Sequence, residues 1–146
     1  VNFETVLDRV NAELGNAPDS GRFFFGSDVS LVDITFVTFV ERMVASLLYY
    51  KGLKMRRTER WANVEEWLQA WEQKPAYVGM MSDYYTHCQA LPPQIGGCGL
   101  LPDPEVQALA AQIDGKGTWW KLDGLRREGE ERGVVSQARL ERKSYR

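Results

Sequence analysis

The chain has 146 residues, of which 44% are hydrophobic and 26% are charged, a composition typical of a soluble globular protein with one domain and room for an appendage. The formal net charge of −2 gives no general attraction to nucleic acid, so no nucleic-acid partner is expected. No apolar run approaches the roughly 18 residues of a membrane-spanning helix. We therefore expect membrane association only through partners.

Helical spacing of apolar residues predicts a first helix ended by Gly15. Its predicted buried face contains Phe3, Val6, Leu7, Val10 and Leu14. A second, longer helix is predicted from Ser30 to about Lys51, where Gly52 breaks it. Because this helix is apolar over most of its surface, we expect it to be central and buried on several sides.

A capping box is predicted at the start of the long helix, where Ser30 stands three residues before Asp33. The Ser30 hydroxyl can accept a hydrogen bond from the backbone N–H of Asp33, and the Asp33 carboxylate can bond back to the N–H of Ser30. The negative charge also lies in the first turn, where the helix dipole favours it. The predicted role of both residues is structural.

A third helix is predicted with Asn63 as N-cap and Glu66 at the third helical position. Its apolar residues Val64, Trp67, Leu68 and Trp71 share one face. Lys74-Pro75 ends it, and a further helix is predicted from Pro75 towards Cys88. No strand pattern of useful length appears, so the predicted fold class is all-α.

The cysteine and histidine content gives little material for catalysis or metal binding. Cys88 and Cys98 allow a disulfide or two free thiols, and free thiols are the default. His87 adjoins Cys88, but neighbours in sequence rarely direct both side chains at one reacting atom. One His and two Cys also fall short of the four ligands of a structural zinc site.

The ordered landmarks of residues 1–90 resemble the C-terminal, all-helical domain of the glutathione transferase superfamily. The residues that carry the resemblance are Phe24-Phe25-Gly26, the box of Ser30 and Asp33, Trp61 and Trp67, and Lys74-Pro75-Ala76-Tyr77. The sequence departs from the family at Trp61-Ala62-Asn63-Val64, which replaces a proline-centred entry to the third helix. Residues 82–98 resemble a segment found in a subgroup from oxygenic photosynthetic lineages, which includes plastid-directed members.

The resemblance also implies what this chain lacks. In the family, glutathione binds mainly to an N-terminal thioredoxin-like domain, which supplies the catalytic residue. The first predicted helix resembles the family's fifth, so the fourth helix, which lines the electrophile site, has no counterpart either. We therefore expect no catalytic residue, no metal and no cofactor in this chain, with glutathione relevant only if an N-terminal domain is present.

The sequence divides into a helical domain (1–90), a Pro/Gly linker (91–101) and an extension (102–146). The extension is predicted to hold one short helix with Asp103 as N-cap, a Trp-rich segment and a charged tail. The candidate interface residues in that segment are Trp119, Trp120, Leu122 and Leu125. They are expected either to attach the extension to the helical body or to anchor it in a partner.

These features favour a non-catalytic interaction or scaffold subunit that docks with protein partners in a larger assembly. The subgroup resemblance suggests a plastid setting, in the stroma or at the thylakoid surface, with a photosystem-type complex as one host; a cytoplasmic setting is the remaining expectation. The alternative is the C-terminal part of a glutathione transferase whose N-terminal thioredoxin-like domain is missing from this chain.

Overall fold

The structure is a computed structural model that describes residues 2–95 and 99–116, with side chains in 2–89 and 99–114. The described residues form six α-helices and contain no strand; Phe23 and Gly26 form one isolated bridge. The helices are α1 (Phe3–Gly15), α2 (Leu31–Lys51), α3 (Ala62–Glu72), α4 (Pro75–Met80), α5 (Tyr84–Ile95) and α6 (Pro104–Ala111). Short helical turns are η1 (Pro18–Ser20), η2 (Glu59–Trp61) and the π-helical η3 (Gln112–Lys116).

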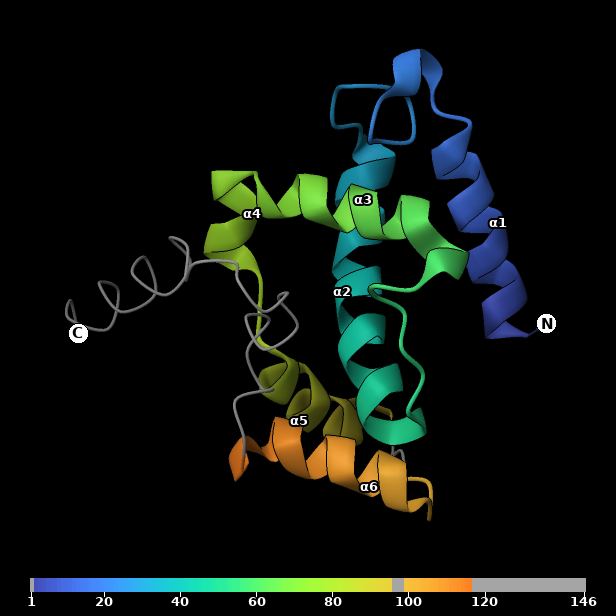
Figure 1. Ribbon diagram of the computed structural model, residues 1–146. Coiled ribbons are helices and arrows are strands. Elements are labelled where there is room, and N and C mark those ends of the chain that lie inside the picture. Colours follow the sequence, from blue (N-terminus) through green and yellow to red (C-terminus); the bar gives the residue numbers. More distant parts are fainter. Residues whose placement is uncertain (1, 96–98, 117–146) are drawn as a thin grey trace, which may run out of the picture.

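The long helix α2 runs through the centre of the molecule (Figure 1). Helix α3 crosses its N-terminal half and packs against α1, while α5 and α6 pack against α2. The all-α fold predicted from the sequence is confirmed for the described residues. None of these helices combines the length and apolarity needed to cross a membrane.

The end of α2 depends on Gly52, as predicted. Gly52 adopts a left-handed conformation with φ of 68°, and its N–H donates to the carbonyl of Leu48. A Cβ at this position would also lie 2.8 Å from Cγ2 of Val106, a residue of α6. Glycine is therefore favoured here both by backbone conformation and by the close approach of α6.

The part of the core between α2 and α3 is rich in aromatic rings. Trp67 is fully buried and packs edge-on against Trp71, with ring centroids 6.5 Å apart. Phe23, from the turn before α2, packs edge-on against Trp71 at 5.7 Å. The buried aliphatic residues around these rings include Leu7, Leu14, Val37, Val40, Val44, Val64 and Leu68.

Helix α3 begins differently from the prediction. Its N-cap position is Trp61, without a side-chain cap, and Asn63 lies inside the helix. The first N–H groups are capped from another helix, because Oδ1 of Asn11 on α1 accepts from the N–H groups of Asn63 (3.0 Å) and Val64 (3.2 Å). The predicted cap of Asn63 and Glu66 is therefore wrong. Asn63 instead donates its side-chain N–H to the carbonyl of Asn11, and Glu66 lies near Arg22 at the surface.

The segment after Pro75 also differs from the prediction of one continuous helix. Helix α4 ends at Met80, and α5 starts at Tyr84. The break is satisfied by side chains, since Oε1 of Glu41 accepts from the N–H of Ser82 (2.7 Å) and Oδ1 of Asp83 accepts from the N–H of Thr86 (2.7 Å). Carboxylates positioned on the freed backbone donors favour two helices over one.

The expected division into body, linker and extension does not match the packing. Helix α5 continues to Ile95, so residues 91–95 of the expected linker are helical. Helix α6 and η3 belong to the main core, where Ala110 and Ile113 are buried with residues of α2. The single short helix expected in the extension is α6, followed by the π-helical turn. Residues 99–116 therefore belong to the same folded body as α2.

Candidate interaction surface

The predicted capping box is present, and its aspartate does more than cap α2. Asp33 is fully buried; its Oδ2 accepts from the Ser30 N–H (2.9 Å) and hydroxyl (2.5 Å), while the Asp33 N–H donates to Ser30 Oγ at 3.4 Å. Its Oδ1 accepts from the N–H of Phe24 (3.1 Å) and from Nε1 of Trp67 (2.8 Å). One carboxylate therefore connects the turn before α2, the start of α2 and the middle of α3.

The charge on Asp33 is stabilised despite its burial. Burial alone would raise the pKa of this carboxyl, but hydrogen bonds from Ser30, Phe24 and Trp67 outweigh it and hold the pKa below the ordinary value. Four donors on one buried carboxylate leave it no free position for a ligand. The role of Ser30 and Asp33 is to fix the fold.

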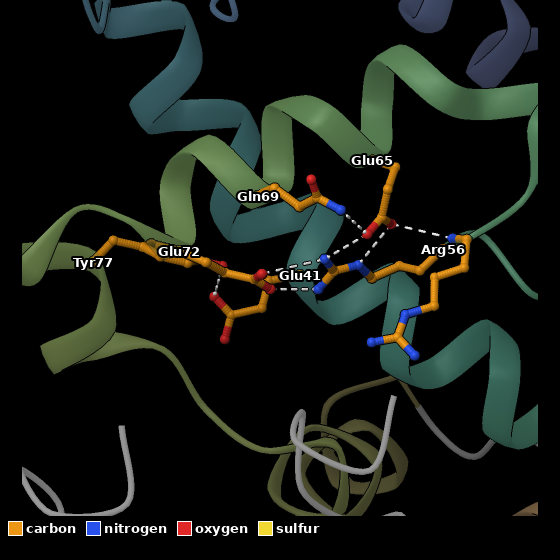
Figure 2. A network of polar contacts seen from close by, with 7 residues as sticks. Glu41, Arg56, Glu65, Gln69, Glu72 and Tyr77 are labelled. Atoms are coloured by element: carbon orange, nitrogen blue, oxygen red, sulfur yellow. Dashed lines mark hydrogen bonds and ion pairs between the residues drawn. The ribbon is translucent and has the colours of Figure 1, made fainter. Parts of the chain in front are cut away.

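A second buried charge network surrounds Arg56 (Figure 2). Nε and Nη2 of Arg56 each donate to the Glu65 carboxylate at 3.0 Å, and Nη1 and Nη2 donate to Glu72. Gln69 donates to Glu65 at 2.9 Å. The Arg56 and Glu65 side chains are only 11% and 12% exposed. Burial lowers the pKa of Arg56, but both carboxylates outweigh it and raise it overall. The network ties the loop after α2 to α3.

Glu41, on α2, forms a third network that the sequence did not indicate. Its carboxylate accepts from Tyr77 Oη (2.9 Å) and from the N–H of Ser82 (2.7 Å), and it pairs with Nε2 of His87 at 2.7 Å. Figure 2 shows Glu41 and Tyr77 facing one another near Glu72. Burial raises the pKa of Glu41, but these contacts outweigh it and lower the pKa below the usual value. Glu41 therefore joins α2, α4 and α5.

In the networks around Arg56 and Glu41, the polar side chains form hydrogen bonds and ion pairs with one another. A cavity of about 10 Å³ between Glu41, Arg56, Glu72, Tyr77 and Tyr84 has room for about one water molecule.

His87 and Cys88 have different partners: His87 pairs with Glu41, whereas the buried free thiol of Cys88 contacts the carbonyl of Ala45 at 3.5 Å. Burial raises the pKa of that thiol to about 12, which disfavours a reactive thiolate. Within 2–95 and 99–116, no group of His, Cys, Asp and Glu is suited to hold a metal.

An exposed apolar stripe lies along the N-terminal half of α2. It consists of Val32, Phe36, Phe39 and Met43, which are 38%, 40%, 55% and 38% exposed. Their spacing of i, i+4, i+7 and i+11 places them on one face of the helix. We call this set the α2 stripe. Large apolar side chains in a continuous row, rather than scattered singly, are typical of a surface that another segment covers.

The register of α2 explains why the stripe is open. The buried residues Asp33, Val37, Val40 and Val44 have the same spacing as the stripe and follow it by one residue. One residue corresponds to about 100° around the helix, so the stripe lies beside the face packed on α3 rather than within it. The prediction that α2 is buried on several sides is therefore wrong for its N-terminal half.

The sequence-predicted site residues have different outcomes. Ser30 and Asp33 come together as a capping box, whereas Asn63 and Glu66 do not form a cap. Trp119, Trp120, Leu122 and Leu125 lie outside the described residues, as does Cys98. Sequence reasoning missed the stripe, although the all-round apolar pattern of α2 contained it. It also missed the Glu41 and Arg56 networks, whose partners are distant in sequence.

The fold and the capping box together define an all-helical domain organised around one long, N-capped central helix. The profile described as "Glutathione S-transferase, C-terminal domain" matches residues 1–70. Residues 1–70 are therefore similar to the glutathione S-transferase C-terminal domain. No curated protein and no solved structure gives a significant match to the chain.

Proposed function

We propose that this chain is a non-catalytic interaction subunit, built on a glutathione S-transferase C-terminal-like domain, which docks into a larger protein assembly. The single observation that carries the proposal is the α2 stripe, with Phe39 55% exposed in the middle of a continuous apolar row. The expected partner surface is a protein segment with large apolar side chains, because the stripe itself carries no charge.

The proposed setting is a plastid, in the stroma or at the thylakoid surface, with a photosystem-type complex as host. Its support is the resemblance of residues 82–98 to a subgroup from photosynthetic lineages. The observed polar networks are compatible with a docking role, since Asp33, Glu41 and Arg56 are used to join helices. Attachment to a membrane would then go through the partner.

The test compares the tagged full chain with two variants in extracts of solubilised thylakoids, separated on native gels. Phe39→Lys places a charge in the stripe. Ile34→Lys is a matched control, since Ile34 is 52% exposed and lies about 140° from Phe39 around α2. We expect wild type and Ile34→Lys to migrate with a large complex and Phe39→Lys to migrate as free protein. Free migration of all three, or equal incorporation of all three, would overturn the proposal.

A second candidate is the C-terminal part of a glutathione transferase with a thioredoxin-like domain upstream. The match of residues 1–70 to the C-terminal domain of that family favours it, and upstream residues would then cover the stripe. The mass of the intact natural polypeptide tests it, because it requires about one further domain of ~100 residues. If the natural polypeptide has only the 146 residues of this chain, and it shows no thiol transfer to a generic electrophile in the presence of glutathione, this candidate is excluded.

A further inference from the structure

We propose that residues 117–126 of the same chain dock on the α2 stripe in the free protein. This inference rests on the stripe itself and not on the proposed function. The segment reads GTWWKLDGLR and lies outside the described residues. It carries four large apolar side chains, Trp119, Trp120, Leu122 and Leu125, against the four of the stripe.

The first step of the argument is where the described chain ends. Helix α6 packs against α2, and Ile113 in the following turn is buried in the core. The hydroxyl of Tyr49, in the last turns of α2, donates to both carboxylate oxygens of Asp114, at 3.0 and 3.2 Å. The chain therefore enters residues 117–126 while fastened to the same helix that carries the stripe.

The second step is reach. Met43 precedes Tyr49 by six residues, which corresponds to about 9 Å along α2 and about 120° around it. A path over the helix surface from Asp114 to Met43 is then about 20 Å long, which six or seven extended residues span. Trp120 is the sixth residue after Asp114. Leu125 is the eleventh, about 35 Å of extended chain from Asp114, so about 15 Å of chain remains beyond Met43 in the direction of Phe36 and Val32.

The third step is the shape of the surface. The stripe is bounded on one side by Thr35, Arg42 and Ser46, which are polar, and on the other by the face packed on α3. It is therefore one helix face wide, a width that suits a single short segment rather than a whole domain. Gly117 precedes the four apolar residues and Gly124 lies between Leu122 and Leu125, positions at which glycine permits a turn.

The docking is tested by acrylamide quenching of tryptophan fluorescence in the full chain. The other tryptophans, Trp61, Trp67 and Trp71, are at most 7% exposed. The fluorescence that acrylamide can quench therefore reports on the pair Trp119 and Trp120. A Trp119→Phe/Trp120→Phe variant supplies the background. We expect the quenching constant of the pair to be several-fold below that of free tryptophan amide. Phe39→Lys should raise it towards that value, and Ile34→Lys should leave it unchanged.

Two further measurements keep the test decisive. Met43→Lys, at another position of the stripe, repeats the comparison should Phe39→Lys fail to fold by circular dichroism. A 100-fold dilution series separates the same chain from a second copy, because protection by the same chain does not depend on concentration. A fully quenched pair in wild type, protection unaffected by stripe variants, or protection lost on dilution would each overturn the docking. None of these outcomes decides whether a partner binds in thylakoid extracts.

Discussion

The indole Nε1 of Trp67, in the middle of α3, donates a hydrogen bond of 2.8 Å to Oδ1 of Asp33, in the first turn of α2. The residue that caps one helix is thus also the buried acceptor for another. A purely local cap would contribute about 1 kcal/mol. Here its loss would leave two further donors, the Trp67 indole and the N–H of Phe24, without their partner in the core.

The first prediction follows from this difference. Asp33→Ala should lower the free energy of unfolding by about 3 kcal/mol or more, because it leaves buried donors unpaired. Ser30→Ala should cost about 1 kcal/mol. Asp103→Ala is a matched control, since Asp103 caps α6 through bonds to Glu105 and Val106 only. Urea denaturation gives all three values.

A combined variant checks the coupling within the capping box. Ser30→Ala/Asp33→Ala should cost less than the sum of the two single changes, because each side chain accepts a hydrogen bond from the backbone N–H of the other residue. Strictly additive losses would argue against a reciprocal box of Ser30 and Asp33. A cost of Asp33→Ala no larger than that of Asp103→Ala would show that Asp33 acts only as a local cap.

The features predicted correctly from the sequence are those that act over a few residues. The capping box spans three positions, and Gly52 ends α2 through its own left-handed conformation. Such signals operate on neighbouring atoms, so their physics is complete within the local sequence. The same holds for the Pro75 start of α4.

The features that were missed depend on tertiary contacts. Asn11 caps α3 from 52 and 53 residues away, which no local pattern contains. For α2, the apolar residues surround most of the helix, so periodicity could not separate the buried Val37 from the exposed Phe36. Only the positions of α3, α5 and α6 decide which side of α2 is covered, and the stripe lies on a part of the surface that they leave open.

The second prediction distinguishes the observed cap of α3 from the one expected from sequence. Asn63→Asp should cost about 1–2 kcal/mol, because it replaces the donor to the Asn11 carbonyl by a carboxylate oxygen. Asn11→Asp should be nearly neutral, since Oδ1 still accepts from two N–H groups at a helix N-terminus, where negative charge is favoured. Thermal or urea melts measure both, and the reverse order would restore Asn63 as the N-cap.

The third prediction concerns pH. Because Tyr77, Ser82 and His87 outweigh burial and lower the pKa of folded Glu41, its contribution to stability is fully present above the unfolded pKa of about 4.3. That contribution is lost as the pH falls through the lower, folded pKa. The free energy of unfolding of wild type should therefore decrease between about pH 5 and pH 3.

Glu41→Gln isolates this contribution. The variant should be less stable at pH 7 and should lose less stability on acidification than wild type, because the side chain at position 41 no longer titrates. Glu13→Gln, at an exposed position of α1, is the control and should retain the slope of wild type. Urea melts at pH 3, 4, 5 and 7 supply the slopes; equal slopes for wild type and Glu41→Gln would exclude a role for Glu41 in acid sensitivity.

The fourth prediction compares two buried tyrosines that line the same small cavity. The hydroxyl of Tyr77 donates to Oε2 of Glu41 at 2.9 Å, whereas the hydroxyl of Tyr84 is buried and has no hydrogen-bond partner among the residues that the structure describes. Tyr77→Phe should cost about 1.5–3 kcal/mol, the usual range for a hydrogen bond to a charged group. Tyr84→Phe removes a polar group that gains nothing in the folded state, so it should be neutral or stabilise the protein by up to about 1 kcal/mol. Urea denaturation at pH 7 measures both, and equal costs for the two variants would mean that the Tyr84 hydroxyl is satisfied in solution.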